Sequence, residues 1–248
     1  MQKTILITGG SRGIGAATAL LAARAGYAVG VNFTTNAAAA DAVVQQVRAA
    51  GGQAIALQAD VADEGQVVAM FGAMDAAFGR LDALVNNAGM VDQTSRVDAM
   101  TGERLQRMFA VNVLGSFMCA REAVKRMSTR YGHAGGAIVN VSSAAARIGS
   151  PGQYVDYAAA KGAIDTFTLG LAKEVAAEGI RVNAVRPGII ETDIHASGGL
   201  PGRARDVAPQ VPMQRAGTAD EVAQSIMWLL SDAASYTTGA LLDVTGGR

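Results

Sequence analysis

The chain has 248 residues, half of them apolar, so it is long enough to bury a large hydrophobic core. Its 21 basic and 21 acidic side chains balance, which gives no electrostatic reason to expect nucleic acid or an anionic membrane surface as a partner. One cysteine and two histidines exclude an internal disulfide and form no cluster with metal-ligand spacing. No apolar run is long enough for a signal peptide or a bilayer span, so we expect a cytoplasmic, soluble protein without a bound metal.

Short apolar runs alternate with longer helical segments along the chain. The runs with strand character are 4–7, 28–33, 54–58, 83–85, 137–141, 181–185 and 241–244. A continuous apolar run is typical of a strand that is buried on both faces. The alternation therefore predicts an α/β fold, a doubly wound parallel sheet with helices on both faces, in one domain over residues 1–248.

Two helices and one irregular segment have clear sequence signals. Residues 36–50 form an alanine-rich segment with valines on one side, which Gly51 and Gly52 end. Thr218 and Glu221 have the spacing of a capping box that opens a helix toward Leu230. Residues 188–217 are rich in glycine and proline and lack periodicity, which predicts an active-site lid.

A glycine-rich turn, residues 8–15, follows the first strand directly. Its glycines at positions 9, 13 and 15 let the backbone approach a phosphate closely, and the helix that follows presents free N–H groups. Such a turn can also be only a tight connection between a strand and a helix. Its position after the first strand, where folds of this class bind nucleotides, favours a pyrophosphate site.

The end of the second strand bears on the choice of cofactor. NAD-binding versions of this turn carry an acidic residue about 20 positions further on, but residues 31–36 contain no carboxylate. Arg12 could pair with a 2′-phosphate, or it could be a solvated loop charge. The pattern favours NADP(H), and NAD(H) stays possible.

Tyr157 and Lys161 lie four residues apart, hence on one face of a helix. A lysine charge, joined by an oxidised nicotinamide, would lower the pKa of the phenol and make it a usable base. The pair by itself is common. Ser142 and Ser143 end the strand before it, and Asn112 is an asparagine in an apolar helix, which needs a hydrogen-bonding partner.

With these residues in order, the sequence resembles the short-chain dehydrogenase/reductase family over essentially the whole chain. The motifs that carry the resemblance are 8–15, Asp60, 86–89, Asn112, Ser143, Tyr157, Lys161, Pro187-Gly188 and Thr192. Within the family it looks closest to bacterial glucose 1-dehydrogenase-like or 3-oxoacyl-acyl-carrier-protein-reductase-like members. The resemblance implies a single-domain Rossmann fold with a seven-stranded parallel sheet.

The resemblance also implies a role for each catalytic residue. Tyr157 would be the general acid or base, and Lys161 would hold the nicotinamide ribose and lower the tyrosine pKa. Ser143 would bond the substrate carbonyl, and Asn112 would anchor a water that links Lys161 to solvent. Ser143 precedes Tyr157 by one residue more than in most members, so Ser142 and Ser150 remain alternatives. Tyr154 has no lysine four positions on and is interpreted as a pocket residue at most.

The glycine turn and the resemblance together predict a set of cofactor contacts at the strand ends. These are Gly9, Ser11, Arg12, Gly13, Ile14, Gly15, Asn32, Thr34, Asp60, Val61, Asn87, Ala88, Gly89, Tyr157, Lys161, Pro187, Gly188, Ile190 and Thr192.

The predicted activity is hydride transfer between NADP(H) and a ketone or secondary alcohol. The alternative is a nucleotide sensor or scaffold that has kept the fold and lost the chemistry. No feature selects a particular small-molecule substrate; His195 and Arg203 could contact a polar one or could be solvated residues of the lid. By resemblance we expect a homotetramer with contacts in 99–130, 157–178 and 241–247.

Overall fold

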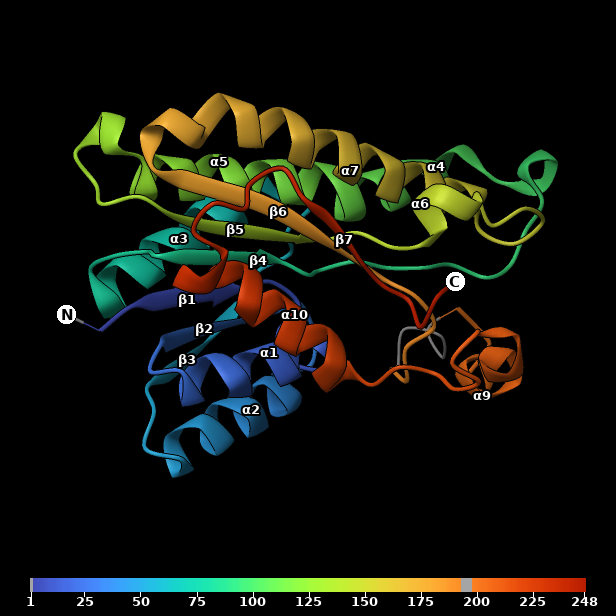
Figure 1. Cartoon of the computed structure of the whole chain (residues 1–248), viewed down its shortest axis with the longest axis horizontal. Helices are drawn as coiled ribbons and strands as arrows, with labels where there is room; N and C mark the ends of the chain where they lie inside the picture. The colour runs from blue at the N-terminus through green and yellow to red at the C-terminus, as the bar shows by residue number, and fades with distance from the viewer. Residues whose placement is uncertain (1, 193–197) are drawn as a thin grey trace.

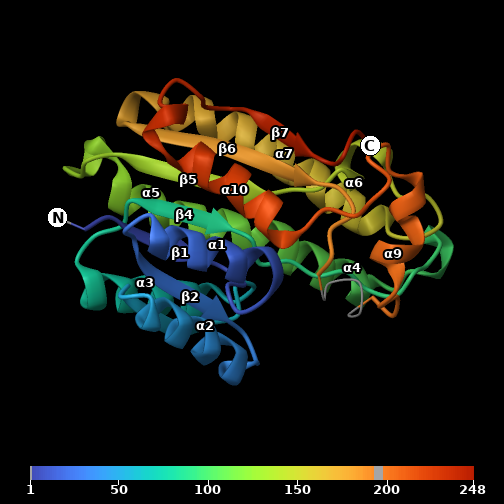
Figure 2. The same cartoon turned by 60° about the horizontal axis from the view of Figure 1, so that its bottom comes forward.

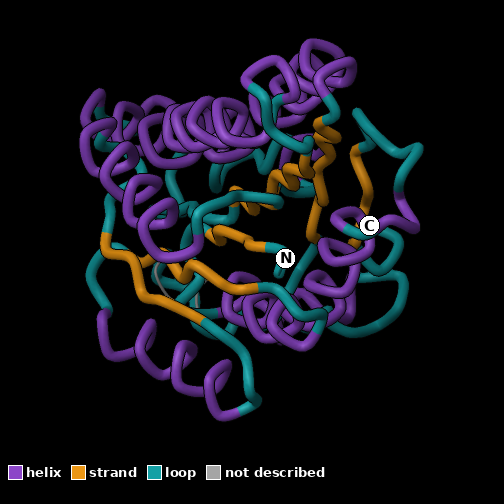
Figure 3. Tube along the Cα trace, turned by 90° about the vertical axis from the view of Figure 1, so that its left-hand side faces the viewer, coloured by secondary structure: helices purple, strands orange, loops and turns teal. Residues whose placement is uncertain are grey.

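A computed structural model describes residues 2–192 and 198–248. Its centre is one parallel sheet between two layers of helices (Figures 1 and 3). The strands are β1 (Thr4–Ile7), β2 (Ala28–Phe33), β3 (Ala54–Gln58), β4 (Ala83–Asn86), β5 (Gly136–Val141), β6 (Ile180–Pro187) and β7 (Leu241–Val244). They are the seven runs that the sequence predicted, with small shifts at the ends.

The strand order is β3-β2-β1-β4-β5-β6-β7, and every neighbouring pair is parallel. Ile5 of β1 lies opposite Val29 of β2 on one side and Ala83 of β4 on the other. The chain therefore moves from β1 outward to β3 and then crosses back to β4. Folds of this type bind ligands at the carboxyl ends of the strands where the order reverses.

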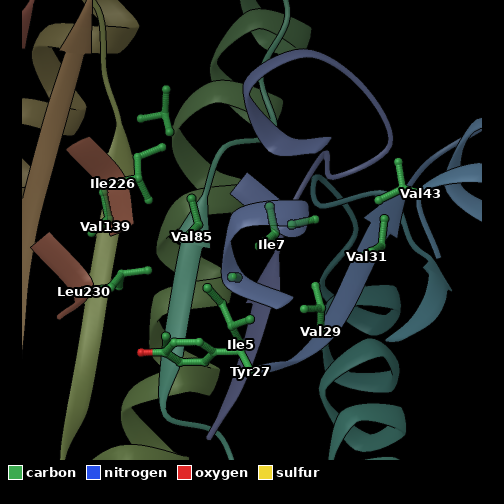
Figure 4. Packing of buried hydrophobic residues seen from close by; sticks show 14 of the residues in the cluster. Ile5, Ile7, Tyr27, Val29, Val31, Val43, Val85, Val139, Ile226 and Leu230 are labelled. Atoms are coloured by element: carbon green, nitrogen blue, oxygen red, sulfur yellow. The ribbon is translucent and has the colours of Figure 1, made fainter. Parts of the chain in front are cut away.

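The helices form two layers because each strand sends alternate side chains to opposite faces. Ile5 and Ile7 enter the core that packs against one layer, and Leu6 between them enters the core on the other face. Figure 4 shows Val43 and Ile226 packed against the first of these cores. The first layer is α1 (Gly13–Arg24), α2 (Ala37–Ala49) and α10 (Ala219–Leu230); the second is α3 (Glu64–Phe78), α5 (Gly115–Met127) and α7 (Val155–Val175).

The predicted helix starts are confirmed by their caps. The Asn36 side chain accepts a hydrogen bond from the Ala39 N–H at the start of α2. At the start of α10, Thr218 and Glu221 form the reciprocal capping box. Helix α1 begins inside the glycine turn, at Gly13.

Shorter helices complete the chain. One π-helical segment, η2 (Ala110–Leu114), joins α4 (Gly102–Phe109) to α5. The others are η1 (Val97–Ala99), η3 (Thr129–Tyr131), α6 (Ala145–Ile148), η4 (Ala176–Glu178), α9 (Arg203–Val207), η5 (Ala208–Gln210) and η6 (Asp232–Ala234). In the part of the chain described, no helix is both long enough and apolar enough to cross a membrane.

The segment 188–217 is tied together at its two ends. The Glu191 N–H donates to the Gly217 carbonyl, and the Gly217 N–H donates to the Ile189 carbonyl, both at 2.9 Å. Beyond this bridge, α9 lies at the same end of the molecule as α6 and the C-terminus (Figures 1 and 2). The described residues of this segment are thus joined at its base, and they include α9.

Candidate active site

A cavity of about 570 Å³ opens at the carboxyl ends of the strands. Its size is in the range that holds a small-molecule ligand or cofactor. Most of the predicted residues line it: Gly9, Ser11, Arg12, Gly13, Ile14, Thr34, Asp60, Val61, Asn87, Ala88, Gly89, Ser143, Tyr157, Lys161, Pro187, Gly188, Ile190 and Thr192. The parallel sheet therefore brings motifs from the whole chain to one place.

The glycine turn is held in a conformation that other residues rarely adopt. Gly9 and Gly13 have φ angles of +60° and +53°. The Asn87 side-chain amide donates to the carbonyls of Thr8 and Gly9 at 2.9 and 3.0 Å, which fixes the turn against the end of β4. The N-cap residue of α1, Arg12, makes no side-chain cap. The start of α1 thus faces the cavity with the geometry of an anion site.

Gly15 and Asn32, also expected to contact a cofactor, are buried and are not among the described residues that line the cavity. A Cβ at Gly15 would lie 2.4 Å from the Gly9 carbonyl oxygen, so this glycine permits the tight packing of the turn. The buried Asn32 side chain accepts from the Gly9 N–H at 3.0 Å and donates to the Ala59 carbonyl at 3.0 Å. Both residues therefore stabilise the glycine turn through contacts with Gly9.

Arg12 lines the same cavity as three polar, uncharged residues that follow the end of β2. These are Thr34, Thr35 and Asn36, and all three are exposed. Among the described residues that line the cavity, the only side-chain carboxylate is that of Asp60, which follows β3. Its Oδ1 accepts from the Ala62 N–H at 2.9 Å. The region beside Arg12 could therefore receive a negatively charged group without repulsion.

Tyr157 and Lys161 face the cavity from the first turns of α7. The Lys161 Nζ lies 5.6 Å from the centre of the Tyr157 ring and donates to the Val141 carbonyl at 2.7 Å. Burial raises the pKa of the Tyr157 phenol to about 12, against a lowering influence from a hydrogen bond with Ser143. Burial also lowers the pKa of Lys161 to about 8, although the nearby Asp165 carboxylate raises it.

Burial thus has a larger effect on the pKa of Tyr157 than Ser143 has. The expected lowering of this pKa by Lys161 together with an oxidised nicotinamide stays a prediction. Tyr157 is therefore a protonated phenol at neutral pH. A protonated phenol that faces the cavity can act as a general acid without further adjustment.

The three candidate serines have different surroundings. Ser143 is half-buried, lines the cavity together with Tyr157 and has a lowering effect on the pKa of that phenol, while its Oγ accepts from the Ala145 N–H at 3.1 Å. Ser142 is buried and donates to the Lys161 carbonyl at 3.2 Å, so its hydroxyl hydrogen is engaged. Ser150 lies on the wall in a left-handed conformation with φ +47°. The geometry favours Ser143 as the partner of Tyr157.

Asn112 is fully buried in the π-helical segment, behind the wall. Its amide donates to the carbonyls of Met90 and Met108, both at 3.0 Å, and its Oδ1 accepts from the Met90 N–H at 3.1 Å. A Cβ at Gly89 would lie 2.9 Å from this Oδ1 and 3.6 Å from the Lys161 Nζ. Asn112 thus has the partners that its burial requires, and Gly89 lies next to both its Oδ1 and the Lys161 Nζ.

Sequence reasoning missed part of the wall. The missed residues are Phe33, Thr35, Asn36, Met90, Val111, Val141 and Arg248. Phe33 and Val141 are the last residues of β2 and β5, and a position at a strand end is the signal that could have found them. The segments 91–101, 144–154 and 189–211 were expected to form part of the substrate pocket, and Val91, Ala144, Ala145, Ile148 and Ile189 from them line the cavity. Tyr154 lines the cavity as suggested, and so does Arg203. His195 lies outside the described residues. Among the described residues, no group of three His, Cys, Asp or Glu side chains could hold a metal.

The geometry has counterparts in known proteins. The model of the family described as Enoyl-(Acyl carrier protein) reductase matches residues 9–248. The structure of a short chain dehydrogenase from Burkholderia cenocepacia in complex with NADP superposes with a TM-score of 0.90 at 34% identity, covering 99% of this chain and 97% of that one. The chain belongs to the short-chain dehydrogenase/reductase family.

Other short-chain dehydrogenases/reductases are similar over the same length. The Escherichia coli protein named Uncharacterized oxidoreductase YgfF is 60% identical over 243 residues, 98% of each chain. The 3-ketoacyl-(acyl-carrier-protein) reductase from Brucella melitensis, complexed with NADH, has a TM-score of 0.91 at 32% identity and covers 99% of this chain and 98% of its own. The predicted family and Rossmann-like fold are confirmed, and the chain is an oxidoreductase.

Proposed function

We propose that the chain transfers hydride between NADP(H) and a ketone or secondary alcohol, with Tyr157 as the residue that transfers the proton. The observation that carries this proposal is that Ser143, the Tyr157 phenol and the nearby Lys161 line the same cavity as the glycine turn. One cavity thus joins a dinucleotide site to an acid catalyst.

The chain's own residues divide the work of reduction. A bound reduced nicotinamide supplies the hydride to the carbonyl carbon and is itself oxidised. Tyr157 and Ser143 donate hydrogen bonds to the carbonyl oxygen, and Tyr157 gives up its proton to that oxygen as the alcohol forms. The Lys161 charge favours the phenolate that remains, because the two side chains are neighbours on α7. Oxidation of an alcohol runs through the same groups in reverse.

The residues present fit a dinucleotide. The left-handed Gly9 and Gly13 and the start of α1 would hold the pyrophosphate, and Asp60 and Val61 the adenine. Ile190 and Thr192 would meet the carboxamide. Arg12 with its uncharged neighbours supports NADP(H), since a 2′-phosphate would pair with the guanidinium there. Of the two similar solved structures, the Burkholderia cenocepacia dehydrogenase is in complex with NADP and the Brucella melitensis reductase is complexed with NADH.

The segment 188–217 is proposed as the lid over the substrate part of the cavity. Its described residues on the cavity wall include Gly188, Ile190 and Arg203. The bridge between Ile190 and Gly217 anchors its base. A covered site excludes water from the reacting groups.

We also propose a homotetramer. The neighbouring helices α4, η2, α5 and α7 expose several large apolar side chains, namely Leu105, Phe109, Leu114, Phe117 and Leu169. An apolar patch of this kind on a protein surface supports a protein interface. It falls within residues 99–130 and 157–178, two of the predicted contact regions. Light scattering of the purified chain measures the assembly.

A coupled absorbance screen of ketones and secondary alcohols, each with NADPH and NADH, tests the proposed activity. We expect turnover with neutral ketones and a preference for NADPH. A small 3-oxoacyl thioester belongs in the panel, because a similar protein is named a 3-ketoacyl-(acyl-carrier-protein) reductase. Cofactor binding without turnover across the whole panel would instead favour the sensor or scaffold.

A further inference from the structure

The substrate part of the cavity contains a cation in a fixed position. Arg203, the first residue of α9, lines the cavity with Ser150 and Tyr154. Its Nη2 donates to the Gln153 Oε1 at 2.6 Å, and its Cζ lies 5.4 Å from the centre of the Tyr154 ring. An amide oxygen and a ring face orient a guanidinium without neutralising its charge.

Gln153 and Tyr154, the two residues that contact the Arg203 guanidinium, are themselves fixed by hydrogen bonds and packing. Tyr154 is buried, and its N–H donates to the Ser150 carbonyl at 3.1 Å. The Gln153 carbonyl accepts from the Ser95 N–H at 3.0 Å. A Cβ at Gly198 would lie 3.2 Å from the Tyr154 hydroxyl, so the ring is packed from that side as well. Arg203 therefore rests on a rigid platform and is not a freely moving surface charge.

The charges of the described wall residues are unevenly distributed. Asp60 is the only side-chain carboxylate among them, and it follows β3, an edge strand of the sheet. In the ranges 2–192 and 198–248, no carboxylate lies within 4.0 Å of the Arg203 guanidinium. A neutral substrate would leave this charge in a partly closed cavity without a counterion, which is costly.

We propose that Arg203 binds an anionic group of the substrate, a carboxylate or a phosphate. The inference rests on the proposed function and narrows its substrate to an oxo acid, a phosphorylated ketone or the corresponding alcohol. The planar fork of arginine matches the paired oxygens of both groups.

The residues under Arg203 and the proposed proton-transferring residue share one end of α7. Tyr154 is the N-cap residue of this helix, and Tyr157 lies one turn further on, about 5 Å along the helix axis. A series of oxo acids with the ketone at carbon 3, 4 or 5 therefore samples the distance between the anion and the carbonyl.

The test compares each oxo acid with its uncharged primary amide, with saturating NADPH and the intact chain. In the wild type we expect kcat/KM for the best acid to exceed that for its amide by about tenfold or more, the value of one charged hydrogen-bonded contact. Dihydroxyacetone phosphate against dihydroxyacetone forms the second arm. A preference in that arm alone assigns the subsite to phosphate, and a preference in the first arm assigns it to carboxylate.

Variants then locate the preference. Arg203→Met, which keeps the apolar stem, should bring the acid-to-amide ratio close to one, and Arg203→Lys should keep part of it. Arg205→Met is the matched control, since Arg205 is exposed on the same helix and is not on the wall; it should keep the wild-type ratio. Added salt should reduce the acid-to-amide ratio of the wild type and leave the ratio of Arg203→Met unchanged. The salt dependence of the wild type tests the role of the charge even if a variant folds poorly.

The outcomes separate this inference from the proposed function. Turnover of neutral ketones or of the thioester with no preference for either anion overturns the role of Arg203 and leaves hydride transfer intact. A preference that survives Arg203→Met also overturns it. Absence of any turnover across the panel is a failure of the proposed function itself.

Discussion

The two ends of the cavity are built in different ways. The proposed cofactor end consists mostly of main chain and short motifs, with the glycine turn and residues 86–89 at the ends of neighbouring strands. The proposed substrate end consists of side chains such as Ile148, Tyr154 and Arg203, from loops and short helices. A binding site made of main-chain groups keeps its binding properties when side chains elsewhere in the chain are substituted. A site made of loop side chains changes its specificity when any one of those side chains is substituted.

The difference between the two ends of the cavity has a physical cause. A pyrophosphate is bound by N–H groups whose direction is set by a few glycine φ angles, so that site needs a local sequence. A substrate is selected by the shape and charge of side chains, which can come from any part of the chain. Tyr157 stands where the two ends meet, and its variants should affect chemistry more than binding.

The largest expected effect is that of Tyr157→Phe. Without the phenolic hydroxyl no group in its place can give a proton to the carbonyl oxygen, so kcat/KM for reduction should fall by about a thousandfold or more. The Kd of NADPH, measured by fluorescence titration, should stay close to the wild-type value. Substantial remaining turnover would show that another group transfers the proton.

Removal of the Ser143 hydroxyl should have the next largest effect. Ser143→Ala loses a donor to the carbonyl oxygen, and we expect kcat/KM to fall by about a hundredfold. Ser142→Ala is the matched comparison, because Ser142 donates to the Lys161 carbonyl, and its loss should cost less than about tenfold. A larger loss in Ser142→Ala than in Ser143→Ala would reassign the role to Ser142.

The raised pKa of Tyr157 predicts opposite pH profiles for the two directions. Reduction needs the protonated phenol and should be flat around neutral pH. Oxidation needs the phenolate, so its kcat/KM should rise about tenfold per pH unit until the pH reaches the pKa in the cofactor complex. That pKa will lie below about 12 because the oxidised nicotinamide is positively charged. An oxidation rate that does not change with pH would contradict this role of the phenol.

The smallest expected effect concerns the choice of cofactor. Arg12→Met should raise the Kd of NADPH by about tenfold, since one charged contact is lost, and leave that of NADH unchanged. Arg24→Met is the control on the same helix, with an exposed arginine away from the cavity. Equal weakening of both cofactors would assign Arg12 to the pyrophosphate or to the fold.

Much of the fold could be predicted, because its signals are local. Seven continuous apolar runs became seven strands of a parallel sheet, and the Asn36 and Thr218 caps formed where expected. The same holds for the Gly9 to Gly15 turn and for Tyr157 and Lys161 on one helical face. Periodicity, capping and glycine spacing act over a few residues, so the sequence alone determined the fold class and the residues at the strand ends.

Only the tertiary structure decided which of these residues face the cavity and how they titrate. Asn32 and Gly15 proved to support the turn from behind, Ser143 was separated from Ser142, and Asn112 found its partners on Met90 and Met108. Desolvation depends on everything packed around a group, so the pKa of Tyr157 rises although a lysine is near. The platform under Arg203 likewise joins three separate segments, and no local pattern predicts their contact.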